Sequence, residues 1–269
     1  MKRERADLLL VRRGLLPSRE RARAAILAGD VFANGQRVLK AGEQLPADAE
    51  IVLRKAPPYV SRGGVKLAGA LDFFDIEPAG RVAADIGAST GGFTDVLLKR
   101  GVDKVYAIDV GYGQLAWSIR NDPRVVVMER TNIRRLDPSR LDTQPDIVTV
   151  DVSFISVRKI LDSLIRLLSP GGDLIVLVKP QFEGERRQVG RGGVVRDPKT
   201  HKEILGRLAC EVRTAGLALE SLTYSPIKGA DGNIEYWLHA RKGQAGRNQA
   251  EAEELVERVV EEAHATLQR

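Results

Sequence analysis

The sequence has few of the residues that mark an extracellular, membrane-spanning or metal-binding protein. Its single cysteine, Cys210, permits no intrachain disulfide and has no second cysteine nearby for a zinc or redox site, so we expect it to be a small buried residue. No stretch approaches the ~20 apolar residues of a membrane-spanning helix, and Arg12 and Arg13 interrupt the apolar N-terminal run, which excludes a signal peptide. The three histidines are scattered. We therefore expect a folded cytoplasmic protein with no metal site and no membrane association.

Composition and charge indicate a globular chain with one basic segment. Of the 269 residues, 43% are hydrophobic and 29% are charged, and the net charge is +6. Residues 1–60 hold 12 basic and 7 acidic side chains, a balance of 12 − 7 = +5, which leaves 30 − 29 = +1 for the rest. The sequence therefore predicts a basic domain over residues 1–60 and a nearly neutral domain over residues 61–269.

The first sixty residues predict two short helices followed by a small sheet. Residues 4–14 carry apolar side chains between charges, and Ser18 is a helix N-cap residue that precedes a second amphipathic stretch. Gly29 ends that helix, and the Asn34-Gly35 pair between two apolar runs predicts a hairpin. Residues 50–53 supply a further strand.

Four arginines of this segment, Arg12, Arg13, Arg19 and Arg23, predict a nucleic-acid-binding face. Arg19 and Arg23 are four residues apart on the second helix, and the forked guanidinium group suits phosphate recognition. A solvated basic face is the alternative interpretation. Residues 5–22, with the Arg-x-Asp, Arg-Gly-Leu and Ser-Arg landmarks and the later Asn-Gly pair, resemble the S4 RNA-binding domain. That resemblance implies structured RNA as the ligand.

From residue 81 onward, short apolar strands alternate with helical patterns. Strands are expected at residues 82–86, 104–109, 125–128, 146–151 and 173–178, and an antiparallel pair at residues 217–224 and 234–240. This order predicts a three-layer α/β fold, a mostly parallel sheet with an antiparallel closing strand. Ligands of such sheets bind at the carboxyl ends of the strands.

The first of these strands leads into a glycine-rich loop that favours S-adenosylmethionine (SAM) as the cofactor. Ser89 replaces a glycine that a dinucleotide site needs, and the Gly-Lys-Ser/Thr of a P-loop is absent. The Asp85 carboxylate suits the SAM ammonium group and Asp109, at the next strand end, suits the ribose diol. An NAD enzyme places a carboxylate much as Asp109 is placed, so Asp109 alone is ambiguous. The predicted cofactor residues are Asp85, Gly87, Ala88, Ser89, Gly91, Gly92, Phe93, Thr94 and Asp109.

Ionisable residues end or flank three other apolar strands. Asp151 ends its strand and Lys179 directly follows its strand, whereas Glu235 lies between apolar residues at the start of the last one. A charge next to a buried strand is costly unless it is paired or solvated, which makes these positions candidates for a functional site. The alternative interpretation is that these are ordinary strand-end charges that face water, and for Glu235 both interpretations stay open.

The large domain resembles the FtsJ-like ribose 2′-O-methyltransferases and, over nearly the whole chain, the TlyA family. The resemblance rests on Ser-Arg-Gly-Gly-Val-Lys-Leu at 61–67, Gly-Ala-Ser-Thr-Gly-Gly-Phe-Thr at 87–94, Asp-Val-Ser-Phe-Ile-Ser at 151–156 and Lys-Pro-Gln-Phe at 179–182. It implies a Rossmann-like SAM-dependent methyltransferase domain after a small α+β S4 domain. It also implies a Lys66, Asp151, Lys179 and Glu235 tetrad. Asn132 stands where many relatives have an acidic residue facing adenine.

The family modifies cytidine ribose in small- and large-subunit ribosomal RNA, so the resemblance implies ribosomal RNA in subunits as the partner. Lys179 would deprotonate the 2′-hydroxyl or stabilise the alkoxide as a positive charge, and the sequence does not decide between these roles. The nucleotide and the subunit also stay open, and we expect a monomer. Three alternatives are a membrane-active haemolysin, a non-catalytic RNA-binding protein and a base methyltransferase. Methylation of a cytosine carbon usually needs a catalytic cysteine. Cys210 lies beside neither the glycine-rich loop nor the Asp151 segment in the sequence, which argues against base methylation.

Overall fold

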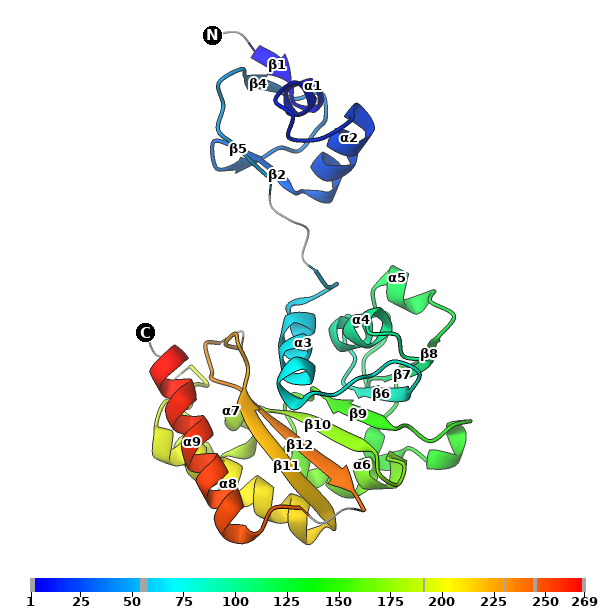
Figure 1. Cartoon of the computed structure of the whole chain (residues 1–269), viewed down its shortest axis with the longest axis vertical. Helices are drawn as coiled ribbons and strands as arrows, with labels where there is room; N and C mark the ends of the chain where they lie inside the picture. The colour runs from blue at the N-terminus through cyan, green and yellow to red at the C-terminus, as the bar shows by residue number, and fades with distance from the viewer. Residues whose placement is uncertain (1–2, 54–57, 191, 230, 244–245, 268–269) are drawn as a thin grey trace. The chain divides into compact units, whose positions relative to one another are not determined.

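The computed structural model describes residues 3–53, 58–190, 192–229, 231–243 and 246–267. It divides the chain into two compact units, Met1–Pro58 and Tyr59–Arg269 (Figure 1). Three of the basic residues counted in the N-terminal segment, Lys2, Arg54 and Lys55, lie outside the described residues.

The N-terminal unit combines two short helices with small antiparallel sheets. Its elements, within the described residues, are β1 (Arg3–Arg5), α1 (Ala6–Arg12), α2 (Arg19–Ala28), β2 (Val31–Ala33), β3 (Gln36–Arg37), β4 (Gln44–Pro46) and β5 (Ile51–Leu53). The Ser18 side chain caps α2 by accepting a hydrogen bond from the Arg21 N–H at 3.2 Å, and Gly29 ends the helix in a left-handed conformation with φ +85°. Both predicted helix signals are therefore confirmed.

The sheets of this unit confirm the predicted hairpin and correct the start of the first helix. Asn34 and Gly35 both have positive φ, 48° and 78°, and join β2 to β3 as an Asn-Gly hairpin turn requires. Residues 4 and 5 were expected in the first helix, but they belong to β1, which pairs with β4. The partner strand lies about forty residues away in the sequence, so no local pattern could reveal the pairing.

The second unit contains the remaining described elements. Its helices are α3 (Arg62–Phe74), α4 (Gly92–Lys99), α5 (Trp117–Arg120), α6 (Leu161–Leu167), α7 (Pro180–Glu183), α8 (Pro198–Thr214) and α9 (Gln249–Leu267). Its strands are β6 (Val82–Ile86), β7 (Lys104–Ile108), β8 (Val125–Met128), β9 (Ile147–Val150), β10 (Asp173–Val178), β11 (Leu217–Tyr224) and β12 (Tyr236–Lys242). Short 3₁₀ turns are formed by Ile133–Arg135, Pro138–Arg140, Val157–Lys159 and Arg186–Gln188.

The described strands of the second unit form one sheet in the order β11-β12-β10-β9-β6-β7-β8. Neighbours from β10 to β8 are parallel, whereas β12 is inserted between β10 and β11 and runs antiparallel to both. This confirms the predicted α/β class with an antiparallel closing strand. Because β12 runs in the opposite direction, its first residues lie at the edge where the parallel strands end.

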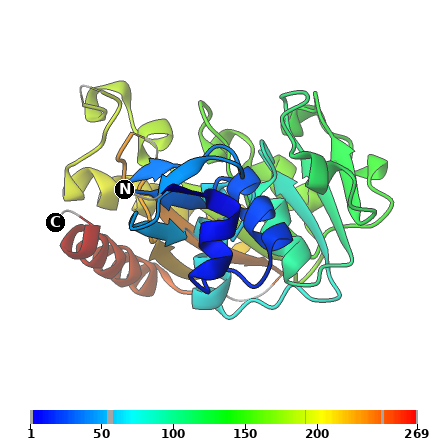
Figure 2. The same cartoon turned by 90° about the horizontal axis from the view of Figure 1, so that it is seen from above.

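Helices cover both faces of this sheet, which gives the three layers visible in Figure 1. Figure 2, seen from above, shows α9 in red at one end of the second unit. Alternate residues of each strand point to opposite faces. Ala83, Val105 and Ile175 pack with residues of α3 and α4, whereas Val148 and Val176 pack with residues of α6, α8 and α9. The C-terminal helix α9 is amphipathic, and its apolar side is buried.

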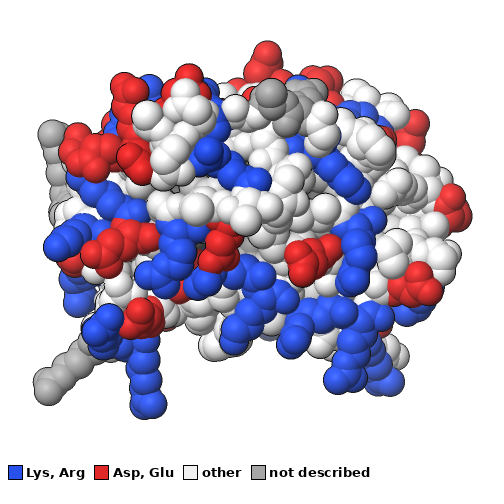
Figure 3. Space-filling model, turned by 90° about the horizontal axis from the view of Figure 1, so that it is seen from below, with Lys and Arg blue, Asp and Glu red and all other residues white. Residues whose placement is uncertain are grey.

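The charged residues of the second unit are largely balanced. Lys and Arg side chains are interspersed with Asp and Glu over most of the face drawn in Figure 3. Examples of ion pairs are Arg241 with Asp173 at 2.7 Å and Lys202 with Glu261 at 3.3 Å. The near-neutral charge counted for residues 61–269 thus corresponds to a mixture of both signs on this face.

Three further features complete the fold. Among the described helices, none is both long and apolar enough to cross a membrane. Cys210 was expected to be a small buried residue, but it is exposed on α8. His201 and His264 are not scattered, because their rings are hydrogen-bonded to each other at 2.9 Å.

Candidate active site and arginine surface

The predicted strand-end residues gather at one edge of the sheet. Asp109, Asp151 and Lys179 directly follow β7, β9 and β10, and Glu235 directly precedes the antiparallel β12. The pairing of Val178 with Tyr236 places Lys179 and Glu235 at the same level of neighbouring strands. Lys66 comes from α3, which packs on one face of the sheet.

The four residues of the predicted tetrad form two ion pairs. Lys66 Nζ lies 2.5 Å from Glu235 Oε2, and Lys179 Nζ lies 2.5 Å from Asp151 Oδ1. Burial raises the pKa of Glu235, which is 3% exposed, while the positive charge of Lys66 acts in the opposite direction. The structure therefore brings together all four residues that the sequence had separated by up to 169 positions.

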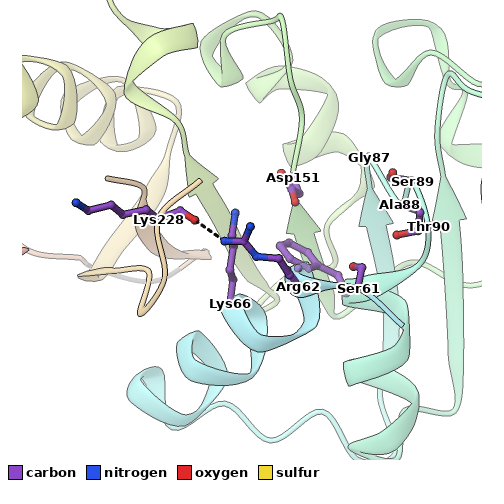
Figure 4. Close-up of a pocket in the computed structure, with 12 residues that line it drawn as sticks. Ser61, Arg62, Lys66, Gly87, Ala88, Ser89, Thr90, Asp151 and Lys228 are labelled. Atoms are coloured by element: carbon purple, nitrogen blue, oxygen red, sulfur yellow. Dashed lines mark hydrogen bonds between the residues drawn. The ribbon is translucent and has the colours of Figure 1, made fainter. Parts of the chain in front are cut away.

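Two cavities adjoin this edge of the sheet. The first, which we call the lysine cavity, has a volume of about 230 Å³ and includes Ser61, Arg62, Lys66, Asp151 and Lys228 in its wall. Figure 4 shows Lys66 rising from α3 and Asp151 from the end of β9 toward this space. The second, the Asp109 cavity, has a volume of about 430 Å³. Gly87, Ser89 and Asp151 line both, so the cavities meet at the glycine-rich loop and Asp151.

The glycine-rich loop is shaped by close backbone contacts. Gly87 has φ +86°, and a Cβ placed on it would lie 2.3 Å from the Asp151 carbonyl oxygen, so only glycine fits. The Ser89 N–H donates to Asp109 Oδ2 at 2.7 Å, and the Gly111 N–H donates to Asp109 Oδ1 at 2.7 Å. These bonds hold the Asp109 carboxylate against the loop while each oxygen keeps a second acceptor site.

Most of the predicted cofactor residues line one of the two cavities. Those that do are Gly87, Ala88, Ser89, Gly92, Phe93, Asp109 and Asn132. The Asn132 side chain also accepts a hydrogen bond from the Arg134 N–H at 3.0 Å. Gly91 and Thr94 are not among the residues that line these cavities and instead help to form the start of α4.

The placement of Asp85 corrects the expectation that it faces a cofactor ammonium group. Its side chain is fully buried, and Oδ2 accepts hydrogen bonds from the Thr94 N–H at 3.0 Å and the Thr94 hydroxyl at 2.7 Å. Burial raises the pKa of Asp85 to about 7, against the effect of the Thr94 hydrogen bonds. The hydrogen bonds of Asp85 to Thr94 thus connect β6 to the start of α4 and stabilise the glycine-rich loop between them.

Sequence reasoning missed several residues at this site. Arg62 and Lys228 line the lysine cavity, where the Arg62 guanidinium donates to the Lys228 carbonyl at 3.1 Å (Figure 4). Ser153 accepts a hydrogen bond from Lys179 Nζ at 2.9 Å. Arg62 lay within a motif that the sequence analysis quoted, but Lys228 is 166 positions away, and only the fold brings them together.

The predicted arginines of the N-terminal unit differ in what holds them. Arg19 and Arg23 lie 3.2 and 3.5 Å from the buried Asp7 carboxylate, which Arg5 also contacts at 3.0 Å. Hydrogen bonds from Arg5 hold the pKa of Asp7 well below its usual range. The side chains of Arg5, Arg19 and Arg23 remain 40%, 51% and 54% exposed. We call this group the arginine cluster.

The other two predicted arginines, Arg12 and Arg13, have separate partners. Arg12 forms an ion pair with Glu4 at 2.9 Å and stays 54% exposed. Arg13 donates to the carbonyl oxygens of Ala49 at 2.7 Å and Ala47 at 2.5 Å, so its head group ties α1 to the loop before β5. Asp7, the centre of the arginine cluster, was not predicted, although it belongs to the Arg-x-Asp landmark.

Each of the two units of the chain matches a known protein family. Residues 59–242 match the model of the FtsJ-like methyltransferase family, and residues 4–51 match the S4 domain. The fold and the site thus define a methyltransferase joined to an S4 domain. A 16S/23S rRNA (cytidine-2′-O)-methyltransferase, TlyA of Mycobacterium tuberculosis, is 46% identical over 242 residues, 89% of this chain and 90% of that protein. The chain belongs to the TlyA family.

Two further relatives cover most of the chain. Hemolysin A of Brachyspira hyodysenteriae is 41% identical over 236 residues, which are 87% of this chain and 98% of that protein. A solved structure from Streptococcus thermophilus, described as a candidate hemolysin, superimposes with a TM-score of 0.77 and 40% identity. It covers 100% of this chain and 98% of its own. The whole two-unit architecture is therefore shared with these relatives.

Proposed function

We propose that this enzyme transfers a methyl group from SAM to the 2′-hydroxyl of a cytidine ribose in ribosomal RNA. The observation that carries the proposal is the pair of ion pairs Lys66–Glu235 and Lys179–Asp151, located where the lysine and Asp109 cavities meet. The curated TlyA relatives carry this activity in their names, including one from Campylobacter jejuni that is 35% identical over 184 residues.

The residues around the Asp109 cavity fit SAM. The absence of a Cβ on Gly87 lets the Asp151 backbone lie close against the glycine-rich loop, and both residues line this cavity. The Asp109 carboxylate has acceptor capacity for a ribose diol, and Asn132 and Ile133 line the same cavity for an adenine. SAM, when bound, supplies an activated methyl group on its sulfonium. The lysine cavity next to it would receive the target ribose.

Within the tetrad we assign Lys179 the role of a fixed positive charge. Its ammonium group is held by Asp151 and by Ser153 at 2.9 Å, both of which are acceptors. A positive charge fixed at this place would stabilise the alkoxide that develops on the 2′-oxygen. The proton would leave through Asp151, which lines both cavities, or through water. Lys66 and Glu235 would hold the ribose side of the site.

Substitution of Lys179 tests this function. In Lys179→Ala and Lys179→Arg, methyl transfer from labelled SAM to ribosomal RNA should fall by about 100-fold or more, because the stabilising charge is lost or displaced. SAM affinity, measured by calorimetry, should change by less than about threefold. The control is Lys199→Ala, an exposed lysine at the start of α8, which should retain turnover. Wild-type turnover in both Lys179 variants would contradict the assignment.

We also propose that the arginine cluster captures the RNA substrate. Three guanidinium groups around one carboxylate leave a net charge of about +2, fixed on a half-exposed surface, which suits neighbouring phosphates. Arg12 would add a weaker contact, and Arg13 would serve the fold of the unit. In this proposal the enzyme acts in the cytoplasm on ribosomal subunits, as a monomer. Sedimentation of the purified protein with and without subunits tests the binding to subunits and the monomeric state.

A further inference from the structure

The segment of residues 151–157 serves both parts of the proposed site. It connects β9 to the 3₁₀ turn Val157–Lys159. Its first residue, Asp151, belongs to the tetrad, and residues 151–155 form one wall of the Asp109 cavity. The position of this segment therefore determines both where the Asp151 carboxylate lies and how wide the cavity is.

The chain that follows β10 holds this segment near both of its ends. At the beginning, Lys179 Nζ contacts Asp151 at 2.5 Å and donates to Ser153 at 2.9 Å. At the end, Glu183 accepts two hydrogen bonds, from the Ser156 hydroxyl at 2.6 Å and from the Val157 N–H at 2.7 Å. Lys179 belongs to the tetrad, whereas Glu183 has no assigned role.

Between these two attachments the backbone is strained. Phe154 has φ +64°, a left-handed conformation that a bulky side chain rarely adopts, and its side chain is 91% exposed. Its ring centre lies 5.1 Å from that of Phe182, on α7. A strained conformation of this kind persists only where the surrounding contacts hold it. After Phe154, Glu183 holds the segment through its two hydrogen bonds, and Ile155 and Val157 pack into the core.

The burial of the Glu183 side chain is unfavourable for the charged carboxylate. Its side chain is 7% exposed, and burial raises the pKa of its carboxyl group. A buried carboxylate is unfavourable unless hydrogen bonds compensate, and here both compensating bonds come from residues 156 and 157. Each of its oxygens therefore acts on the same short segment.

We infer that Glu183 is a positioning residue for methyl transfer: by holding Ser156 and Val157, it fixes the 151–157 segment against the Asp109 cavity. Through this segment it sets the position of Asp151 and of the cavity wall without touching SAM or ribose itself. The inference rests on the proposed function. It concerns a residue outside the tetrad and outside the cofactor loop.

The substitution Glu183→Gln tests the inference with little change in shape. A glutamine has one acceptor oxygen and an NH2 group that only donates, so it cannot accept from both Ser156 and Val157 with separate oxygens, and one of the two hydrogen bonds that the carboxylate accepts is lost. We expect the Kd for SAM, measured by calorimetry, to rise at least tenfold. We expect kcat/KM for RNA methylation to fall by at least the same factor, at a temperature well below thermal unfolding of the variant.

Two other variants make the measurement specific. Ser156→Ala removes one of the two hydrogen bonds and should weaken SAM binding by about threefold, even if Glu183→Gln folds poorly. Glu211→Gln removes a carboxylate that pairs with Arg158 from the side of α8, without contact to residues 151–157, and should bind SAM within twofold of wild type.

The outcomes separate the inference from the function beneath it. Wild-type SAM affinity in both Glu183→Gln and Ser156→Ala would overturn the positioning role. So would a lower melting temperature with unchanged SAM affinity, because that result means a purely structural contact. Failure of the wild-type protein itself to bind SAM would overturn the proposed function instead.

Discussion

In both units of this enzyme, cationic side chains contact buried carboxylates, but the balance of positive and negative charge differs. In the N-terminal unit, the fully buried Asp7 faces three arginines whose side chains are 40–54% exposed. In the methyltransferase unit, two lysines face two carboxylates, and all four side chains are at most 23% exposed. The first arrangement leaves positive charge facing water, and the second neutralises its charge within the protein.

This difference explains how a net charge of +6 is divided between two tasks. An excess of half-exposed guanidinium groups attracts phosphates at a distance and holds them without base recognition. A balanced, buried set of charges creates strong local fields only for a group that enters the site. In the proposed function, capture of RNA and methyl transfer require different electrostatics, and each unit would supply one of them.

The largest expected effect comes from unbalancing the tetrad. Lys66→Met leaves Glu235, 3% exposed, without its cation, and breaking a buried pair in this way costs about 3–5 kcal/mol. Urea unfolding followed by tryptophan fluorescence measures this loss, because both tryptophans lie in the methyltransferase unit and Trp237 is fully buried. Methyl transfer should fall by about 100-fold or more. The control variant Lys199→Met should leave both the free energy of unfolding and methyl transfer unchanged. A free energy of unfolding equal to that of the wild type in Lys66→Met would contradict the proposed buried pair.

A second prediction concerns pH. Because the folded-state pKa of Asp85 is raised to about 7, its protonated form favours folding. This stability is fully present below the ordinary Asp pKa of about 3.9 and is lost as pH rises through about 7. The contribution of Asp85 to the unfolding free energy of the methyltransferase unit should thus be lower at pH 8 than at pH 5, on the order of 2 kcal/mol. The pH dependence of the wild type minus that of Asp85→Asn measures this contribution, because burial lowers the pKa of His201 to about 4 and changes the stability of the same unit in the opposite direction.

Asp7 should behave in the opposite way. Its folded-state pKa is lowered by Arg5, so its stabilising contribution is present above the ordinary Asp pKa and is lost as pH falls below it. Between pH 5 and pH 8 the contribution of Asp7 to the N-terminal unit is constant. Hydrogen exchange of the α1 and α2 amides, compared at these two pH values after correction for intrinsic rates, tests the contrast. A clear gain of protection at pH 5 would be inconsistent with it.

The third prediction separates the arginines of the N-terminal unit. Arg19→Ala should weaken RNA binding by about tenfold and reduce the slope of log affinity against log salt by about one, as expected for a lost phosphate contact. Arg13→Ala should leave the slope unchanged and speed amide exchange near residues 47–49, because Arg13 donates to the Ala47 and Ala49 carbonyls. Equal salt slopes for the two variants would erase the distinction.

The smallest expected effect is local. Ser18→Ala removes the side-chain cap of α2, which carries Arg19 and Arg23, at a cost of about 1 kcal/mol. Amides of α2 should exchange about fivefold faster, whereas methyltransferase stability and SAM affinity stay unchanged. Altered tryptophan-detected unfolding in this variant would show that the units do not respond separately.

Much of the fold could be predicted because its signals are local. The cap at Ser18, the Asn34-Gly35 turn and the apolar strands depend on neighbouring residues, and parallel strands bring their carboxyl ends together in any sheet of this class. Strand-end charges therefore indicated Asp151 and Lys179. Lys66 needed the family resemblance, since a lysine in an amphipathic helix carries no signal of its own.

The remaining features depend on orientation and on long-range contacts. Asp85 was placed correctly at a strand end, but only the fold shows that its side chain faces α4 and not a cavity. The β1–β4 pairing and the contact of Arg62 with Lys228 join distant positions. Glu183 reads as an ordinary acidic residue until its bonds to residues 156 and 157 are seen.

In the proposed function, the tetrad directs methyl transfer to a ribose hydroxyl of ribosomal RNA. The most direct measurement incubates the full-length protein with labelled SAM and with small or large ribosomal subunits, then digests the RNA to nucleosides and separates them. We predict label in 2′-O-methylcytidine with the wild-type enzyme and at most about one hundredth of it with Lys179→Ala. Label in a methylated base, or equal 2′-O-methylcytidine with Lys179→Ala, would contradict the account.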